Sequence, residues 1–243
     1  MPVRAAVSCP VELVPGYKSN LLCRAQNLLS VDVAPELTAN ITSTSGGQSV
    51  SQTFPLTLKG KERSNIILPI TQSLVPGEYV LSLSLAWGTM KENLHDGWVT
   101  VLPDEDGDGM PTTWENLEGL DAFQDDAAKD NDRDGSTNYE EFIAQTNPTD
   151  GDSILGPPSI EGSAETGGLQ LRWHGAPARI YEVEWSEDMA AWQKAEGQGA
   201  VQVGRDRSLG FADGDLGKTG ESNGSSATAS VRKRFYRIAI HIR

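Results

Sequence analysis

The sequence is short of the residues and motifs that most often build catalytic and zinc sites. It contains two cysteines and three histidines in 243 residues. Neither a CxxC pair nor a Cys/His cluster occurs, which argues against a zinc site. GxGxxG, a Walker loop and HExxH are also absent, so no nucleotide-binding or metalloprotease motif is present. We therefore expect a protein that is not an enzyme.

Long apolar runs and basic patches are missing as well. No stretch of eighteen apolar residues occurs, so we expect no membrane insertion. The N-terminal sequence MPVRAAVSCPVELVPG lacks the apolar core of a signal peptide, so an exported protein would carry this chain as part of a larger polypeptide. One basic cluster, formed by Arg232, Lys233, Arg234 and Arg237, falls in a strand pattern. We expect no nucleic-acid partner.

The two cysteines leave one question open. Cys9 and Cys23 lie in SCPVELVPGYKSNLLCR, which has the pattern of two short strands around a Pro-Gly turn. Antiparallel neighbours could bring the two sulfur atoms within bonding distance. Two free, buried thiols fit the sequence equally well.

Acidic charge is abundant, and it is concentrated in one stretch. Residues 104–152 hold sixteen Asp and Glu but only Lys129 and Arg133, a net charge of −14. The whole chain also carries −14, so the remainder is balanced. Uncompensated carboxylates held this close repel one another. A folded segment of this composition needs counter-cations.

Two twelve-residue loops carry this charge, DEDGDGMPTTWE from Asp104 and DNDRDGSTNYEE from Asp130. Each has Asp at positions 1, 3 and 5, glycine at 6 and glutamate at 12. Calcium takes roughly six to eight hard oxygens, and this spacing wraps a chain around one ion, with a carbonyl at position 7. A solvated acidic loop is the alternative, but two complete copies argue against it. The predicted ligands are Asp104, Asp106, Asp108, Met110, Thr112 and Glu115 in the first loop, and Asp130, Asp132, Asp134, Ser136, Asn138 and Glu141 in the second.

The flanking sequence differs from that of a calcium sensor. A sensor EF-hand has a helix on both sides of each loop, whereas DGWVTVLP before Asp104 predicts a strand. Position 8 of the first loop is Pro111, which has no N–H for the bridge between paired hands. Short helices can leave the loops in TTWENLEGL and NYEEFIAQT. We interpret the loops as half-hands that bind calcium for structure.

Residues 104–150 resemble the thrombospondin type 3-like calcium repeats of bacterial secreted and surface proteins. The resemblance rests on the DxDGDG loop with its closing Glu, the GL turn, DDAxxD, the second loop and the final TNP. Ala122, Arg133 and Gln145 depart from the repeat pattern without removing a ligand. The remaining acids of the stretch are further candidates for ligands or their hydrogen-bond partners: Asp121, Asp125, Asp126, Asp150 and Asp152.

The sequence on either side of the calcium segment has the alternation and turns of β structure. Residues 1–102 contain seven candidate strands, as in an immunoglobulin-like sandwich, and resemble bacterial cell-adhesion-related β-sandwiches by pattern. Expected core residues are Leu56, Leu58, Ile67, Leu81, Leu83 and Leu85.

Residues 153–243 begin with the Gly-Pro linker SILGPPSIEGS and resemble fibronectin type III-like modules of bacterial surface proteins. The resemblance rests on Trp173, Pro177, Tyr181, Val183, Trp185, Ser186, Asp188, Trp192, Phe211, Asp213, Arg234, Phe235, Tyr236 and Arg237. One buried face is expected from Trp173, Tyr181, Val183, Trp185, Phe235 and Ile238.

These observations predict a mainly β protein with two immunoglobulin- or fibronectin-like β-sandwiches joined by a calcium-binding loop-helix segment. The predicted domains are residues 1–102, 103–152 and 153–243. We expect a calcium-binding structural or adhesion region of an extracellular or cell-surface bacterial protein, with about two Ca²⁺ ions. Other surface proteins or polysaccharide are the candidate partners. The alternative is an accessory, carbohydrate-binding region of a secreted hydrolase, which a coplanar pair of exposed tryptophans would favour. A dockerin-type module and a cytosolic sensor fit the sequence less well.

Overall fold

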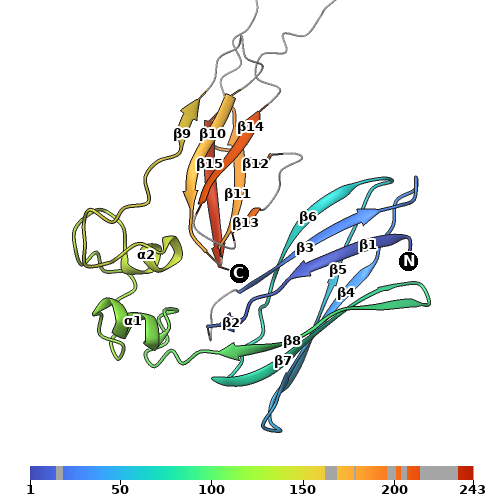
Figure 1. Ribbon diagram of the computed structural model, residues 1–243, viewed down its shortest axis with the longest axis horizontal. Helices are drawn as coiled ribbons and strands as arrows, with labels where there is room; N and C mark the ends of the chain where they lie inside the picture. The colour runs from blue at the N-terminus through green and yellow to red at the C-terminus, as the bar shows by residue number, and fades with distance from the viewer. Residues whose placement is uncertain are drawn as a thin grey trace, which may run out of the picture.

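The chain is mainly β, and two short helices lie in the middle of the sequence (Figure 1). The computed structural model describes residues 1–14, 19–161, 169–177, 179–195, 201–203, 207–213 and 235–242. The helices are α1 (Thr112–Glu118) and α2 (Asn138–Ala144), close to where the sequence predicts them. No helix of the described residues is long and apolar enough to cross a bilayer.

Two sheets in the first part of the chain share one core. The smaller sheet has the order β1 (Val3–Ser8), β3 (Asn20–Asn27), β6 (Arg63–Pro69). The larger has the order β2 (Glu12–Leu13), β8 (Met90–Val101), β7 (Gly77–Trp87), β4 (Glu36–Ser43), β5 (Ser49–Pro55). A single cluster draws Leu21 and Cys23 from the first sheet and Leu37, Leu83 and Val99 from the second. The two sheets therefore pack face to face.

Most of the expected core residues lie in this cluster. Leu56, Leu58, Leu81, Leu83 and Leu85 are buried in it, as predicted. Ile67 is not, because Leu68 is the residue of β6 that points inward and neighbours in a strand face opposite ways. Strand β1 lies in an alanine-rich stretch where the sequence predicted none. It pairs with β3 in a register that sets Val7, not Cys9, opposite Cys23. Cys9 and Cys23 form no disulfide with each other; Cys23 is buried, whereas Cys9 is half-buried.

The last part of the chain forms two further sheets. One has the order β14 (Arg207–Asp213), β10 (Leu169–Gly175), β9 (Ser159–Glu161), so a strand forms where a linker was expected. In the other, β11 (Arg179–Ser186) pairs with β12 (Gln193–Lys194), β13 (Val201–Val203) and β15 (Phe235–Ile242). The basic residues Arg232, Lys233 and Arg234 lie outside the described residues.

A second core lies between these sheets. Trp173, Tyr181 and Val183 are buried in it, as the sequence predicted, and the half-buried Trp185 packs against it. The assignment of Phe235 to this face is wrong. Tyr236, Ile238 and Ile240 are the residues of β15 that pack here, because residues 235 and 238 lie on opposite faces of one strand.

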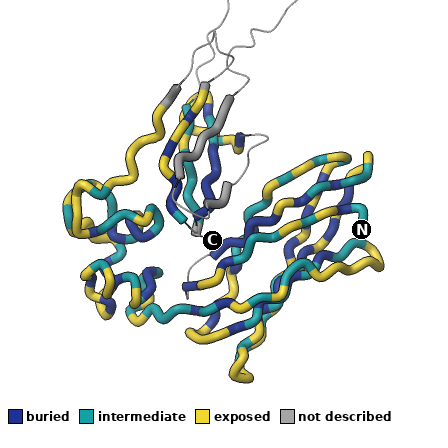
Figure 2. The backbone as a smooth tube through the Cα atoms, in the orientation of Figure 1, coloured by how far each residue is buried: buried dark blue, intermediate teal, exposed yellow. Residues whose placement is uncertain are grey.

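One small contact joins the two parts of the chain. Leu22 on the outer face of β3 and Ile180 on β11 are both fully buried and form a cluster, with Ile67 packed against it. In Figure 2 the backbone is coloured as buried where β11 approaches β3. The strands before and after the calcium segment are therefore in direct contact.

Candidate metal centre

Three aspartates of each loop come together as the spacing predicts. Asp104, Asp106 and Asp108 each place a carboxylate oxygen within 4.8 Å of the others, and so do Asp130, Asp132 and Asp134. The glycine at position 6 makes the sharp turn in both loops, with φ of 93° at Gly109 and 101° at Gly135. An L side chain rarely adopts such angles.

The two loops are held by the same backbone hydrogen bonds. Asp104 accepts from the amides of Gly107 (2.9 Å) and Gly109 (3.1 Å). Asp130 accepts from the amides of Arg133 (2.7 Å) and Gly135 (3.1 Å). Arg133 has a φ of 68°, in the left-handed region where the first loop has Gly107. The second loop is thus closed at some conformational cost that the first avoids.

The closing glutamates give the strongest indication that a cation can bind here. Glu115 and Glu141 are both fully buried. Neither oxygen of Glu115 has a hydrogen-bond partner, and Oε2 of Glu141 has none either. Buried oxygens of Asp106, Asp132 and Asp134 are unpartnered in the same way. Buried carboxylates without partners are costly unless a metal ion binds them.

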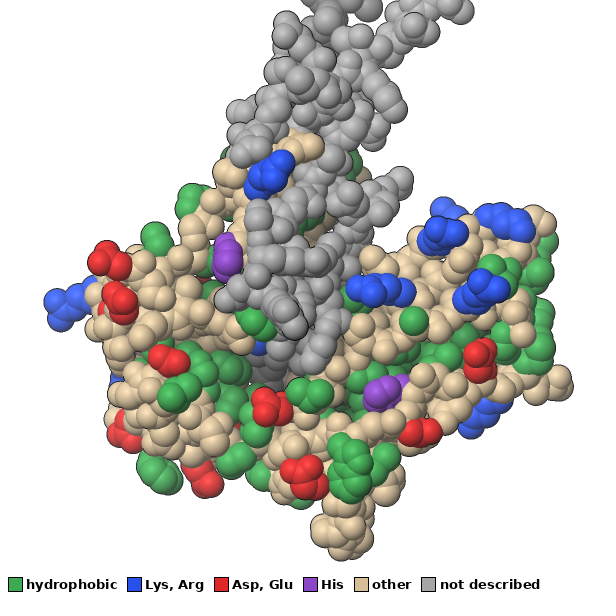
Figure 3. Space-filling view, viewed as in Figure 1, with side chains coloured by type: hydrophobic (Ala, Val, Ile, Leu, Met, Phe, Trp, Pro, Cys, Tyr) green, Lys and Arg blue, Asp and Glu red, His purple; other side chains and the backbone are tan. Residues whose placement is uncertain are grey.

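Electrostatics in the metal-free chain point the same way. Burial, followed by the charges of Asp106, Asp108, Asp126 and Asp104, raises the pKa of Glu115 to about 8. Burial also raises the pKa of Glu141 to about 7, with the charges of Asp132, Asp134 and Asp130 adding to it. Burial raises the pKa values of Asp104 and Asp108 as well. Figure 3 shows acidic side chains gathered over this segment, whereas Lys and Arg lie mainly over the sheets.

The remaining predicted ligands take different positions. The Met110 side chain is fully buried in the apolar core of the segment, so a carbonyl is the group this residue offers. The amide of Ser136 donates to Asp134 (2.7 Å), which matches the bond from Met110 to Asp108 (2.9 Å). At position 9, the Thr112 hydroxyl accepts from the amide of Glu105 (3.1 Å). Asn138 is fully buried, and its Oδ1 has no partner.

The helices that leave the loops pack on each other. Trp114 of α1 and Phe142 of α2 have ring centroids 5.0 Å apart. They belong to a small core with Met110, Leu120 and Val14, the last from the end of β2. A helix of seven residues is too short for its hydrophobic pattern to reveal such a packing partner. The loops therefore form one unit.

Among the further acidic candidates, only Asp126 joins a described metal-binding group. It is buried and lies with Asp108 and Glu115, with carboxylate oxygens within 4.8 Å of one another. Asp121, Asp125, Asp150 and Asp152 are exposed. Asp121 and Asp150 accept amide hydrogen bonds within their own turns.

Arg179 at the start of β11 is a residue that sequence reasoning missed. Its guanidinium donates to the carbonyls of Ile143 and Phe142, both at 2.6 Å, and lies 5.5 Å from the centre of the Phe142 ring. It is 4% exposed. Nothing in the alternation of RIYEVEWS marks this arginine, because its partners are backbone oxygens of a distant helix.

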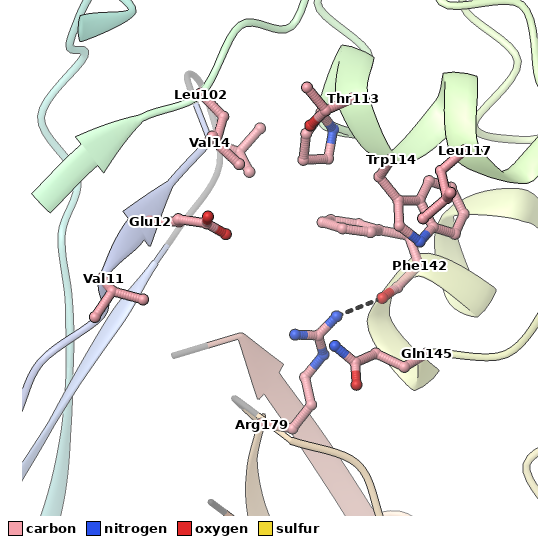
Figure 4. Close-up of a pocket in the computed structure, with 11 residues that line it drawn as sticks. Val11, Glu12, Val14, Leu102, Thr113, Trp114, Leu117, Phe142, Gln145 and Arg179 are labelled. Carbon is pink, nitrogen blue, oxygen red and sulfur yellow. Dashed lines mark hydrogen bonds between the residues drawn. The ribbon is translucent and has the colours of Figure 1, made fainter. Parts of the chain in front are cut away.

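Arg179 also lines a cavity of about 310 Å³ at the junction of β2, the two helices and β11. In Figure 4 its guanidinium points toward α2, with Glu12 on one side and Gln145 on the other. The apolar wall comes from both helices and the first part of the chain: Val11, Val14, Leu102, Pro111, Trp114, Leu117 and Phe142. Three distant segments thus meet here.

The residues present fit a hard divalent cation. Each loop offers carboxylate and carbonyl oxygens without sulfur or imidazole, which are the ligands that calcium and magnesium prefer. Two clusters of acidic side chains with orphaned buried oxygens can therefore bind metal ions.

Comparisons with known proteins leave the chain without a family. No family model matches it, and no curated protein matches its sequence. Among solved structures, the CARDB domain of the PF1109 protein from Pyrococcus furiosus, in complex with di-metal ions, is 14% identical. That match covers 41% of this chain and 87% of the domain at a TM-score of 0.30.

Two other partial matches are of the same kind. A β-glucosidase from Listeria innocua is 14% identical over 41% of this chain and 16% of its own, with a TM-score of 0.32. CsgH from R. palustris is 14% identical over 37% and 87%, with a TM-score of 0.25. Likenesses this low carry no argument about function.

The raised carboxyl pKa values predict how the stability of the metal-free protein depends on pH. Folded Glu115 keeps its proton up to about pH 8, whereas in the unfolded chain it loses it near pH 4.3. Between these values the unfolded state binds fewer protons, so the free energy of unfolding falls as pH rises. Thermal unfolding of chelator-stripped protein from pH 5 to 8.5 should show this fall.

The variant Glu115→Gln, which carries no titratable group at this position, should show a smaller fall than the native chain. Glu118→Gln on the same helix is the control and should behave as the native chain does. Identical pH profiles for the native chain and Glu115→Gln would contradict the assigned cause.

Proposed function

We propose that this chain is a non-catalytic, calcium-binding region of a secreted or surface-exposed bacterial protein. About two Ca²⁺ ions bind the loops at Asp104 and Asp130 and convert a repulsive acidic segment into a rigid joint. The joint sets how an immunoglobulin-like β-sandwich (residues 1–102) and a fibronectin type III-like β-sandwich (residues 153–243) sit relative to each other. Its function is to hold the two β-sandwiches at a fixed spacing and to display them, including for adhesion to other surface molecules.

The contact of Arg179 with α2 carries this proposal. Glu141, the closing ligand of the second loop, directly precedes Phe142 and Ile143, whose carbonyls accept from Arg179. Consecutive strand residues point opposite ways, so Arg179 reaches the calcium segment while Ile180 packs on Leu22 of β3. The second β region is thus anchored to the metal segment and to the first β region by adjacent residues.

The first β region is attached to the same segment from the other side. Val14, just after β2, is buried in the core formed by Met110, Leu120 and Phe142. Met110 follows directly on Gly109 of the first loop, so its position depends on that loop closing. Metal in either loop therefore stabilises a surface on which a β region rests.

The expected energy is moderate. An ion that binds only the folded state adds about 2.7 kcal/mol at a hundredfold excess over Kd. Extracellular modules hold calcium with Kd values of roughly 10⁻⁴ to 10⁻³ M. Such affinities keep the joint loaded outside a cell and empty in a calcium-poor compartment.

Small-angle scattering with calcium and with chelator tests the proposal. Removing calcium should increase the radius of gyration and the maximum dimension, because the acidic segment loosens while each β core stays folded. Asp108→Ala and Glu141→Ala should show the chelated profile even in calcium, and Asp121→Asn, which changes an exposed acid outside the loops, should not. Identical profiles with and without calcium would rule the proposal out.

Arg179→Leu separates metal binding from its mechanical effect. This variant should bind calcium as the native chain does, yet scatter like the chelated protein. We expect a loss of about 1–3 kcal/mol of stability, because buried hydrogen bonds to two carbonyls disappear. Calorimetric titration and scattering on the same sample measure both properties. A calcium-loaded variant with the native scattering profile would contradict the role of Arg179.

A second candidate function, polysaccharide binding, is favoured by one face of the larger sheet. The coplanar tryptophan pair that would favour this function is absent: of the six tryptophans, Trp98 on β8 alone is exposed, at 69%. Val80 lies opposite Trp98 on β7, and the other residues of this face are small and polar, in rows set by the strand registers: Thr42 and Ser49; Ser82, Asn40 and Ser51; Ser84, Thr38 and Thr53. An indole beside hydroxyl and amide groups offers a stacking surface with hydrogen-bond partners.

Binding to insoluble polysaccharides tests this second candidate. If the face binds sugar chains, native protein should sediment with at least one neutral polysaccharide, and Trp98→Ala should stay in solution. Phe123→Ala, which removes another exposed aromatic side chain (78% exposed) far along the sequence, is the matched control. Equal sedimentation of Trp98→Ala and the native chain would exclude this face.

A further inference from the structure

The two loops share a residue that belongs to neither of them. Asp126 lies between the loops, in the stretch DDAAKD, and is 4% exposed. On one side, its amide donates to Oδ2 of Asp108 (3.3 Å), and its carboxylate joins those of Asp108 and Glu115. Asp126 is therefore in contact with the carboxylates of the first loop.

On its other side, Asp126 holds a residue of the second loop. The Nδ2 group of Asn138 donates to the Asp126 carbonyl (3.0 Å) and to Asp126 Oδ1 (3.1 Å). Asn138 occupies position 9 of the second loop and is fully buried. These two hydrogen bonds fix the amide group of Asn138, and its Oδ1 has no hydrogen-bond partner.

Unpartnered buried atoms thus lie on both sides of Asp126. Both oxygens of Glu115 are orphaned beside it in the first loop, and Oδ1 of Asn138 is orphaned in the second. Buried oxygens that accept no hydrogen bond are rare unless a cation or a water molecule contacts them. The acidic cluster around Asp126 is therefore a site for a cation, and Asp126 connects that site to the next.

We propose that Asp126 ligates the first calcium ion from outside its loop and orients Asn138 for the second, so that the two ions bind with positive cooperativity. This inference rests on the proposed calcium function and adds a coupling mechanism to it. An ion in the first site fixes the Asp126 carboxylate, which fixes the Asn138 amide before the second ion arrives. Because coupling is reciprocal, an ion in the second site strengthens the first equally.

A calorimetric titration of the metal-stripped full chain measures this coupling. The native chain should bind two ions, with the second stepwise constant larger than independent sites allow. Asp126→Asn should weaken calcium binding at the first site at least about tenfold, and it should also reduce the coupling between the sites, for which factors of about 5 to 150 are typical. Asp125→Asn removes the same charge from the exposed neighbouring residue and should leave the coupling intact.

Asn138→Ser provides the second variant and covers the case in which Asp126→Asn does not fold. It leaves every carboxylate of the first loop in place, yet should weaken binding there because it removes the link to Asp126. Circular dichroism establishes that each variant keeps its β structure. In a Glu141→Ala background, where only the first site is left to bind, Asn138→Ser should have little effect on it.

The outcomes separate the two proposals. A native chain that binds no calcium overturns the proposed function itself. Two independent ions in the native chain, or an Asp126→Asn variant that behaves as Asp125→Asn does, overturn the coupling and leave the calcium function standing. Weakening of the first site by Asn138→Ser in the intact chain supports the coupling.

Discussion

Repulsion among buried carboxylates is the constraint on which the rest of the structure depends. Glu115 is fully buried beside four aspartates and Glu141 beside three, and three of their four carboxylate oxygens have no hydrogen-bond partner. The chain can relieve this by protonation, which the raised pKa values describe, or by binding divalent ions. Ion binding leaves the glutamates charged and uses the same oxygens to close both loops. The acidic segment is folded in a way that suits a metal ion better than a proton.

The acidic segment contacts both β regions. Its small core receives Val14 from the first part of the chain, and its second helix receives Arg179 from the last part. Among the described residues, the cluster of Leu22, Ile67 and Ile180 is a direct contact between the two β regions.

The sequence predicted those features that repeat at short range. The loop spacing predicted the two aspartate clusters and the glycine turns, because positions 1, 3 and 5 are close along the chain and come to one centre. Strand alternation identified most of the core for the same reason. It failed at Phe235 and Ile67, where the strand was recognised but the inward residue was misassigned. It also gave no sign of Arg179 or of the link between Asp126 and Asn138, since these contacts join residues that are distant in sequence or belong to different motifs.

The most direct test of the central claim is an anomalous diffraction map from crystals grown in calcium. It should show one peak among Asp104, Asp106, Asp108 and Glu115, and a second among Asp130, Asp132, Asp134 and Glu141. Ligand oxygens should lie about 2.3–2.6 Å from each peak. Water at both centres, without an anomalous peak, would contradict the account.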